Sequence, residues 1–213
     1  MELFHFTTGQ MDVNTYIVKQ PDSHECFIID PGGDETALLS YIEQKNLKVT
    51  HILLTHGHFD HIEAVRAIKE TCGASICIHK DDAAMLTDPT KNLSSYLNQS
   101  IVQPEADQYL NNESEIQIGK IIVNIIYTPG HSKGSVCYLY ENVLFSGDTL
   151  FKGSIGRSDF PDSDFNELQN SLKKLLMLNP SLLIYPGHGE FTTLEAEMNQ
   201  NPFLLQIYGN ITS

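Results

Sequence analysis

The sequence predicts an α/β protein with two facing sheets and helices outside them. Short apolar runs typical of strands fill residues 3–30 and 115–145, and segments with helical spacing follow each set. The order strands, helices, strands, helices therefore runs through the chain twice, which favours two sheets packed face to face under outer helices. The chain has 213 residues and is 41% hydrophobic, enough for a sizeable core, and one domain over residues 1–213 is the simplest organisation.

The first half opens with strands, and local signals mark where each element ends. Strands are expected over residues 3–7, 15–19 and 26–30, with a turn at 20–23. A helix should run from residue 34 or 35 to 45, with Asp34 as its cap and with Ala37, Leu38, Tyr41 and Ile42 on its inner face. A strand at 51–54, a helix from near residue 60 to 70, a strand at 75–78 and a helical stretch at 81–86 follow.

The second half repeats this order after a polar segment. Residues 89–105 are rich in Asn, Ser and Gln, and form either a mobile flap over a site or an irregular connection. Strands are expected over 115–118, 121–127, 136–140 and 143–145. Leucines at helical spacing predict a helix over 165–178 capped by Asp164, before a last strand at 182–185 and a C-terminal helix from near residue 192.

Composition excludes several classes of protein. The chain starts without a basic region followed by an apolar core, and no apolar run approaches the roughly 18 residues of a membrane span, so we expect a soluble protein that does not engage membranes. Cys26, Cys72, Cys77 and Cys137 form no CxxC pair, which favours reduced thiols in the cytoplasm. A net charge of −14 with only 13 scattered Lys and Arg argues against a nucleic-acid partner. Nothing in the sequence indicates the oligomeric state.

The segment THGHFDH, residues 55–61, holds four potential metal ligands within six residues. If His56 and His58 continue the preceding strand, their side chains share a face and can bind one ion together. A helix beginning near Asp60 would direct Asp60 and His61 toward a second position beside the first. A single histidine is ordinarily a surface or core residue, but a core would have to satisfy three imidazoles and a carboxylate at one strand end. The cluster therefore predicts a metal site.

Three other apolar strands end in residues of the same type beside glycine. Residues 125–130 lead to His131, residues 143–147 lead to Asp148, and residues 182–187 lead to His188. A turn of Gly or Pro after a buried strand presents the next side chain at the edge of a rigid sheet. Five of the nine histidines share this context, whereas His5, His24, His51 and His79 lack it and are expected to be structural or on the surface.

Seven ligands are too many for one tetrahedral zinc ion and suit two ions that share a carboxylate. The natural allotment gives His56, His58 and His131 to one metal and Asp60, His61 and His188 to the other, with Asp148 bridging. Imidazole and carboxylate suit several metals; we expect zinc, with iron or manganese as alternatives. Asp30 ends another strand, and is either an ordinary turn residue or the hydrogen-bond partner that orients a ligand.

With these residues in place, the sequence resembles the metallo-β-lactamase superfamily, whose signature is HxHxDH followed by a distant His, Asp and His. The resemblance implies an αββα sandwich of two mixed sheets with the site at one sheet edge. The runs Gly147–Phe151 and Gly156–Phe160 are similar to those of the hydroxyacylglutathione hydrolases, or glyoxalase II enzymes, and their short relatives. In those enzymes a basic residue at the place of Arg157 contacts glutathione, so the resemblance implies substrate binding by Arg157; an ion pair with Asp159 is the alternative.

Two departures from the longer glyoxalase II enzymes bear on the substrate. Those enzymes add a C-terminal helical domain that holds much of the glutathione, and this chain ends about 25 residues after His188. They also place a tyrosine soon after the last histidine, where this chain has Gly189, Glu190 and Phe191. Both departures place recognition of glutathione itself in doubt.

The resemblance implies a cytoplasmic hydrolase with two divalent ions. A metal-activated hydroxide would attack the carbonyl of a small-molecule thioester such as S-lactoylglutathione, and Asp60 would hold that hydroxide. The first alternative is a persulfide dioxygenase with one iron at His56, His131 and Asp148, since those enzymes share the Gly-Arg-x-Asp-Phe run. The second is a metal-binding protein without hydrolase activity.

Overall fold

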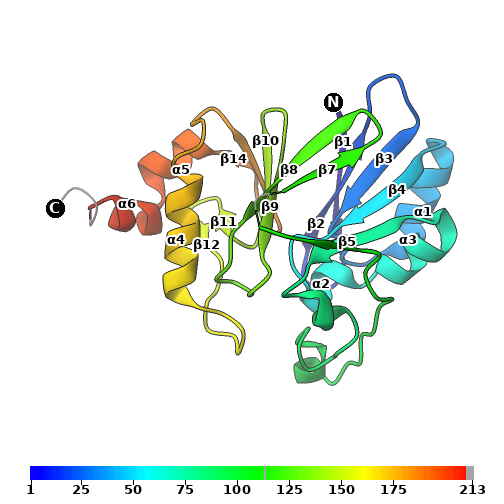
Figure 1. Cartoon of the computed structure of the whole chain (residues 1–213), viewed down its shortest axis with the longest axis horizontal. Helices are drawn as coiled ribbons and strands as arrows, with labels where there is room; N and C mark the ends of the chain where they lie inside the picture. Colours follow the sequence, from blue (N-terminus) through cyan, green and yellow to red (C-terminus); the bar gives the residue numbers. More distant parts are fainter. Residues whose placement is uncertain (113, 210–213) are drawn as a thin grey trace.

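The computed structural model describes residues 1–112 and 114–209, and Figure 1 shows two sheets side by side between two groups of helices. The first sheet has the order β1-β2-β3-β4-β5-β6 and the second has the order β14-β13-β10-β9-β8-β7. Both sheets are mixed: β3 to β6 pair in parallel and β10 pairs in parallel with β13, whereas the other neighbours are antiparallel. The αββα sandwich expected from the sequence is confirmed.

The elements of the first half have the following bounds: β1 Glu2–Thr8, β2 Val13–Lys19, β3 Glu25–Ile29, α1 Glu35–Gln44, β4 Lys48–Leu53, α2 Phe59–Ile62, α3 Val65–Cys72, β5 Ser75–His79, η1 Ala83–Leu86, η2 Ser94–Leu97 and β6 Gln108–Leu110. Those of the second half are β7 Glu115–Ile118, β8 Ile121–Tyr127, β9 Val136–Tyr140, β10 Val143–Gly147, β11 Leu150–Phe151, β12 Ser154–Ile155, α4 Phe165–Leu175, β13 Leu183–Pro186, β14 Thr192–Thr193, α5 Leu194–Gln200 and α6 Pro202–Gly209.

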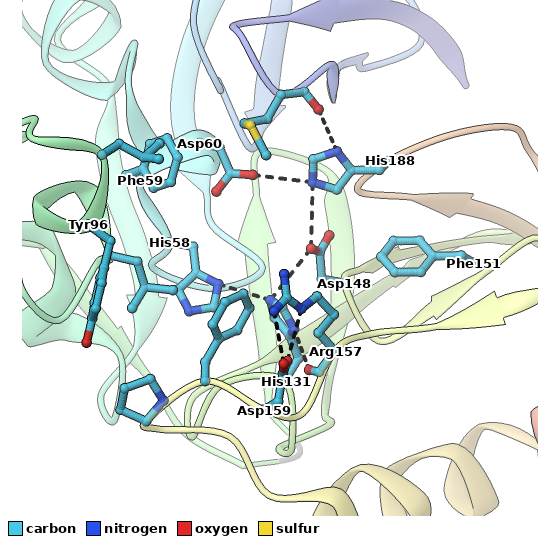
Figure 2. Close-up of a pocket in the computed structure, with 15 residues that line it drawn as sticks. His58, Phe59, Asp60, Tyr96, His131, Asp148, Phe151, Arg157, Asp159 and His188 are labelled. Carbon is cyan, nitrogen blue, oxygen red and sulfur yellow. Dashed lines mark hydrogen bonds and ion pairs between the residues drawn. The ribbon is translucent and has the colours of Figure 1, made fainter.

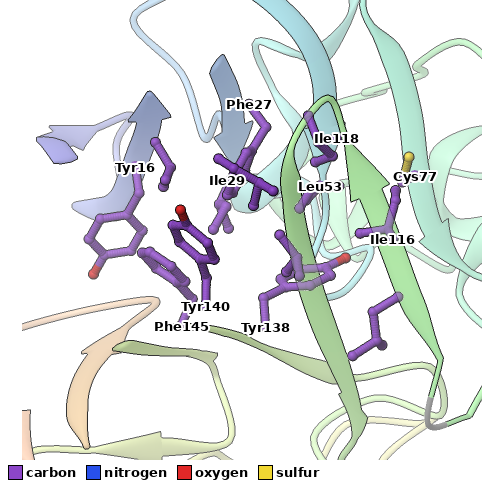
Figure 3. Packing of buried hydrophobic residues seen from close by; sticks show 14 of the residues in the cluster. Tyr16, Phe27, Ile29, Leu53, Cys77, Ile116, Ile118, Tyr138, Tyr140 and Phe145 are labelled. Atoms are coloured by element: carbon purple, nitrogen blue, oxygen red, sulfur yellow. The ribbon is translucent and has the colours of Figure 1, made fainter. Parts of the chain in front are cut away.

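Side chains that point alternately to the two faces of each strand divide the core into three layers. In β3, Phe27 and Ile29 point between the sheets, where Figure 3 shows them near Tyr138 and Phe145 of the opposite sheet. Ile28, one residue away, faces the helices instead and belongs to the cluster under α1 and α3. Successive side chains of a strand point to opposite faces, so each buried strand serves two layers. A third cluster packs the second sheet against α4, α5 and α6.

Helix α4 follows the predicted pattern closely. Leu168, Leu172 and Leu175 are fully buried at helical spacing against the second sheet. The side chain of Asp164 caps the helix by accepting hydrogen bonds from the amides of Asn166 (2.7 Å) and Glu167 (3.1 Å). The helix ends at Leu175, three residues before the expected end.

Three local predictions were wrong, and at Asp34 and Ala64 a tertiary contact overrides the local pattern. Asp34 does not cap α1: it lies in the left-handed region (φ 51°), and its carboxylate accepts a hydrogen bond from the amide of Gly9 instead. Ala37 is exposed, so the inner face of α1 depends on Leu38 and Ile42. The single helix expected over 60–70 is broken into α2 and α3 around Ala64, whose amide donates to the carbonyl of Pro31.

Candidate metal centre

Loops and the short helix α2 at one edge of the two sheets carry the seven predicted ligands. Strand β4 ends at Leu53, so His56 and His58 lie in the loop after the strand and do not continue it as expected. Asp60 and His61 lie on the short helix α2. The loops after β8, β10 and β13 supply the remaining three ligands, His131, Asp148 and His188.

The first group of ligands contains His56, His58 and His131. One nitrogen from each ring lies within 4.8 Å of the others, although 73 residues separate His58 from His131. His58 Nδ1 lies 3.0 Å from His131 Nε2. All three side chains are buried, so three imidazoles converge on one point with little access to water.

The second group contains Asp60, His61 and His188, which also lie within 4.8 Å of one another. His61 Nε2 lies 3.3 Å from His188 Nε2, and Asp60 Oδ2 lies 3.4 Å from the same atom of His188. Figure 2 shows the carboxylate of Asp60 directed at the ring of His188. This group differs from the first because it includes a carboxylate.

Asp148 lies between the two groups. Its Oδ2 is 3.6 Å from Nε2 of His131 in the first group and 3.6 Å from Nε2 of His188 in the second, and its Oδ1 is 3.4 Å from Nε2 of His61. Gly187 makes this position possible, since a Cβ there would lie 2.2 Å from Asp148 Oδ1. The carboxylate therefore has the position that a bridging ligand requires.

Hydrogen bonds from outside the cluster orient four of the five rings. His56 Nδ1 lies 3.1 Å from Thr55 Oγ1, and His61 Nδ1 lies 3.0 Å from Asp30 Oδ2. The backbone carbonyls of Arg157 and Met11 lie 2.9 and 3.0 Å from Nδ1 of His131 and His188. Each contact leaves the Nε2 atom directed inward, as is usual for histidines that bind metals.

Asp30 is buried and has a left-handed backbone (φ 46°) at the end of β3. Besides its contact with His61, its carboxylate accepts hydrogen bonds from the amide and hydroxyl of Thr55, at 2.8 and 2.6 Å. Of the two alternatives drawn from the sequence, this geometry matches the orienting partner, although the residue also makes the turn.

The two groups of ligands differ in their electrostatic environment. Burial and the neighbouring imidazoles lower the pKa of His56 and His58 well below the usual range, which keeps both rings neutral and able to bind metal. Burial would raise the pKa of Asp60, but His61 and His188 hold it below its ordinary value. Burial would lower the pKa of His61, but Asp148, Asp60 and Asp30 raise it to about 10. The carboxylates of Asp148, Asp60 and Asp30 therefore favour a cation at the second group.

Unpaired buried atoms indicate a metal site independently of the types of residue present. His56 Nε2 and Asp148 Oδ1 are buried without any hydrogen-bond partner among the described residues. A buried polar atom left unpaired costs about 1–3 kcal/mol, so two of them directed into one cluster indicate missing partners. Imidazole nitrogen and carboxylate oxygen are ligands suited to zinc, iron and manganese.

A cavity of about 820 Å³ opens beside the cluster. Arg157 lines it and donates hydrogen bonds of 2.9 Å from Nε and Nη2 to Asp159, so the ion pair expected from the sequence is present and substrate binding by Arg157 stays a prediction. Phe191, where the longer enzymes have a tyrosine, lies outside the pocket lining and packs on Tyr185 at 4.3 Å. Position 191 therefore offers no aromatic hydroxyl to the pocket.

The polar segment 89–105, expected to be a flap over a site or an irregular connection, lies at the pocket and lines it with Leu93, Tyr96 and Leu97. Sequence reasoning did not single out these three side chains, whose only local signal was their apolar character within polar sequence. It also missed Asp82. Asp82 is fully buried and accepts hydrogen bonds from Gly57, Ser132 and Gly134, which belong to the two loops that carry the first group. Nothing in its own sequence surroundings marks it.

Comparison with known proteins agrees with this geometry. The family model of the metallo-beta-lactamase superfamily matches residues 8–188. The probable metallo-hydrolase YqgX of Bacillus subtilis is 36% identical over 92% of this chain and 94% of its own length. The hydroxyacylglutathione hydrolase GloC of Haemophilus influenzae is 36% identical over 86% of this chain and 89% of its own.

Solved structures of similar proteins have the same fold. The BLEG-1 B3 metallo-beta-lactamase superimposes with a TM-score of 0.92 at 41% identity, covering 95% of this chain and 99% of its own. TTHA1623, solved in a di-iron-bound form, has a TM-score of 0.84 at 35% identity, covering 94% of this chain and 100% of its own. The chain belongs to the metallo-beta-lactamase superfamily and stands among its metallo-hydrolases.

Proposed function

We propose that the protein is a dinuclear metal-dependent hydrolase that cleaves a small-molecule thioester of a 2-hydroxy acid. The observation that carries the proposal is the pair of ligand groups with Asp148 between them and with two buried, unpartnered donor atoms directed inward. One ion would be held by His56, His58 and His131, the other by Asp60, His61 and His188. Zinc is our first choice of metal, and the di-iron form of TTHA1623 keeps iron in consideration.

Divalent cations in such a cluster supply a water nucleophile of lowered pKa and polarise the substrate carbonyl. The chain's own contribution is to orient the reactants. Asp60 lines the pocket, and His61 and His188 hold its pKa low, so at neutral pH it is an anion that can accept a hydrogen bond from the attacking water. We assign Asp60 this catalytic role in addition to ligation.

In the reaction, the water oxygen bonds to the acyl carbon, the carbon–sulfur bond breaks, and the sulfur leaves with the electron pair and takes up a proton. A thiolate is a good leaving group, so the site needs no strong general acid. Phe160 packs against both His58 and His131, with ring centroids 5.3 and 5.8 Å apart, and limits access of bulk water to the first group. Arg157 is placed to contact the substrate from the pocket wall.

The test joins metal analysis to hydrolysis of lactoyl thioesters of glutathione and of N-acetylcysteamine. The purified protein should hold two ions per chain and hydrolyse at least one of the two substrates. His58→Ala should abolish hydrolysis, whereas His24→Ala, at an exposed turn, should leave it unchanged. A fully metal-loaded protein that hydrolyses neither thioester would refute the proposal.

The same preparations test the alternatives. Oxygen consumption with a persulfide and one iron per chain would favour the dioxygenase, for which three ligands suffice. Hydrolysis of a β-lactam in place of thioesters would favour the activity named for BLEG-1. A metal-loaded chain inert toward all of these substrates would favour a binding protein.

A further inference from the structure

Apart from the ligands, the lining of the pocket is strongly apolar. Side chains from separate parts of the chain meet there: Met11, Phe59, Tyr96, Leu97, Phe151 and Phe160. A cavity of about 820 Å³ lies in the range that encloses a small organic ligand. Apart from the predicted ligands, Arg157 and Asp159 are the only charged side chains of the lining.

Three of these side chains are exposed to solvent. Met11, Tyr96 and Leu97 are 51%, 67% and 50% exposed, and they come from the loop after β1 and from η2. Single exposed apolar residues need no explanation, but three around one cavity next to reactive groups indicate a surface that a ligand covers. In Figure 2, Tyr96 stands beside His58 along the wall of the pocket.

The charges of the pocket disfavour glutathione as the thiol arm. Glutathione carries two carboxylates and one ammonium group, and its carboxylates need cationic partners. Among the described residues that line the cavity, Arg157 is the sole Lys or Arg, and two of its N–H groups already donate to Asp159. Arg157 also stacks on Phe160 at 4.5 Å. An anionic arm would approach a chain of net charge −14 and compete with Asp159 for one cation.

We infer that the substrate of this site is a thioester whose thiol arm is uncharged and apolar, an alkyl or aryl thiol, and that Tyr96 and Leu97 bind this arm. The inference rests on the proposed hydrolase and narrows its substrate class. The acyl group meets the ligand cluster, and the apolar arm extends along η2. Since Arg157 is the one Lys or Arg among the described lining residues and is paired with Asp159, selectivity comes mainly from burial of apolar surface.

The experiment compares three thioesters that share the lactoyl group and differ in the thiol: benzyl mercaptan, N-acetylcysteamine and glutathione. The metal-loaded protein should hydrolyse the benzyl thioester with a kcat/KM at least about tenfold above that of the glutathione thioester, mainly through KM. A glutathione thioester with the highest kcat/KM would overturn the inference and leave the hydrolase standing. Failure to hydrolyse any of the three would instead overturn the proposed function.

Matched surface variants locate the arm. Leu97→Ser should lower kcat/KM for the benzyl thioester about five- to tenfold and lower that for the N-acetylcysteamine thioester by clearly less, because the benzyl arm has the larger apolar surface to bury. Leu205→Ser is the control, since Leu205 on α6 is 48% exposed and lies outside the pocket lining. Tyr96→Ser pairs in the same way with Tyr109→Ser on β6, where Tyr109 is 57% exposed. Equal losses on both substrates, or none in either pocket variant, would refute the assignment.

Discussion

Substitution of Asp82 by alanine should loosen one ligand group and leave the other intact. The carboxylate of Asp82 connects two loops: Oδ2 accepts hydrogen bonds from the Gly57 amide (3.2 Å) and the Ser132 hydroxyl (2.6 Å), and Oδ1 accepts one from the Gly134 amide (2.6 Å). Gly57 lies between His56 and His58, and Ser132 follows His131. A single buried side chain thus fixes the relative positions of all three ligands in the first group.

The magnitude follows from the donors left behind. Ser132 can turn its hydroxyl to Ser135, 2.7 Å away, but the amides of Gly57 and Gly134 would be left without this acceptor. Each buried unpaired amide costs about 1–3 kcal/mol, so we expect loss of the acceptor for two amides in Asp82→Ala to lower the free energy of unfolding by about 2–6 kcal/mol. Loss of an outer hydrogen-bond partner also lowers metal affinity by about 10- to 100-fold, here at the first group alone.

The assay combines urea unfolding with titration of metal against a chelator. Asp81→Ala is the control, because Asp81 is the adjacent carboxylate, is exposed, and pairs with His79 Nδ1 at 3.6 Å. One tightly bound ion and one weakened ion per chain are expected for Asp82→Ala, and two tight ions for Asp81→Ala. Unfolding free energy within about 0.5 kcal/mol of wild type, together with two unchanged affinities, would refute the reasoning.

The pH dependence gives a signature specific to Asp82. Burial raises the pKa of this carboxyl from 3.8 to about 6, so the folded state binds its proton more tightly than the unfolded state does. The proton that Asp82 binds in the folded state stabilises the protein by about 3 kcal/mol below pH 3.8, and this stabilisation is lost as the pH rises through 6. In metal-free protein, wild type should therefore lose more stability than Asp82→Ala between pH 4 and 7, and parallel curves would contradict this assignment.

Three further predictions concern other parts of the site and core. Asp30→Asn should weaken metal binding about tenfold at the second group, because it disturbs the contact with His61; an unchanged chelator titration would contradict it. Gly187→Ala should remove bound metal, since the added Cβ would lie 2.2 Å from Asp148 Oδ1 and 2.8 Å from His61 Cε1, and full metal content in elemental analysis would refute this. Burial raises the pKa of Cys26, Cys77 and Cys137 to about 12, 12 and 11, so Ellman's reagent should label only the half-buried Cys72 in the folded protein and four thiols after unfolding; rapid labelling of a second thiol would be inconsistent with the core described.

The fold could be predicted from the sequence because its signals are local and repeated. Strands such as β3 and β8 are nearly continuous apolar runs, and α4 has leucines at helical spacing behind a capping aspartate. The site was predictable for the same reason: His131, Asp148 and His188 each follow a buried strand and a Gly turn, so their strands bring them to one sheet edge. Among the described residues, His5, His51 and His79 stay outside the ligand groups and bond instead to Asn14, Thr50 and Asn112.

What the sequence did not reveal depends on contacts between distant segments. Asp34 has the composition of a cap, yet the amide of Gly9, 25 residues away, takes its carboxylate. Asp82 lies in an unremarkable polar stretch, and its role exists only because the loops after β4 and β8 meet over it. Tyr96 gains its place through the path of an irregular segment that has no periodicity.

The structure describes no helix long and apolar enough to cross a membrane within residues 1–112 and 114–209. The four cysteines are unpaired, as their spacing predicted.

The central claim is that two cations bind between the five histidines, Asp60 and Asp148. Anomalous diffraction from crystals of the metal-loaded protein tests it directly. We expect two peaks, one among His56, His58 and His131 and one among Asp60, His61 and His188, with Asp148 in contact with both. A single peak at full metal loading, or metal bound elsewhere on the chain, would contradict the dinuclear site.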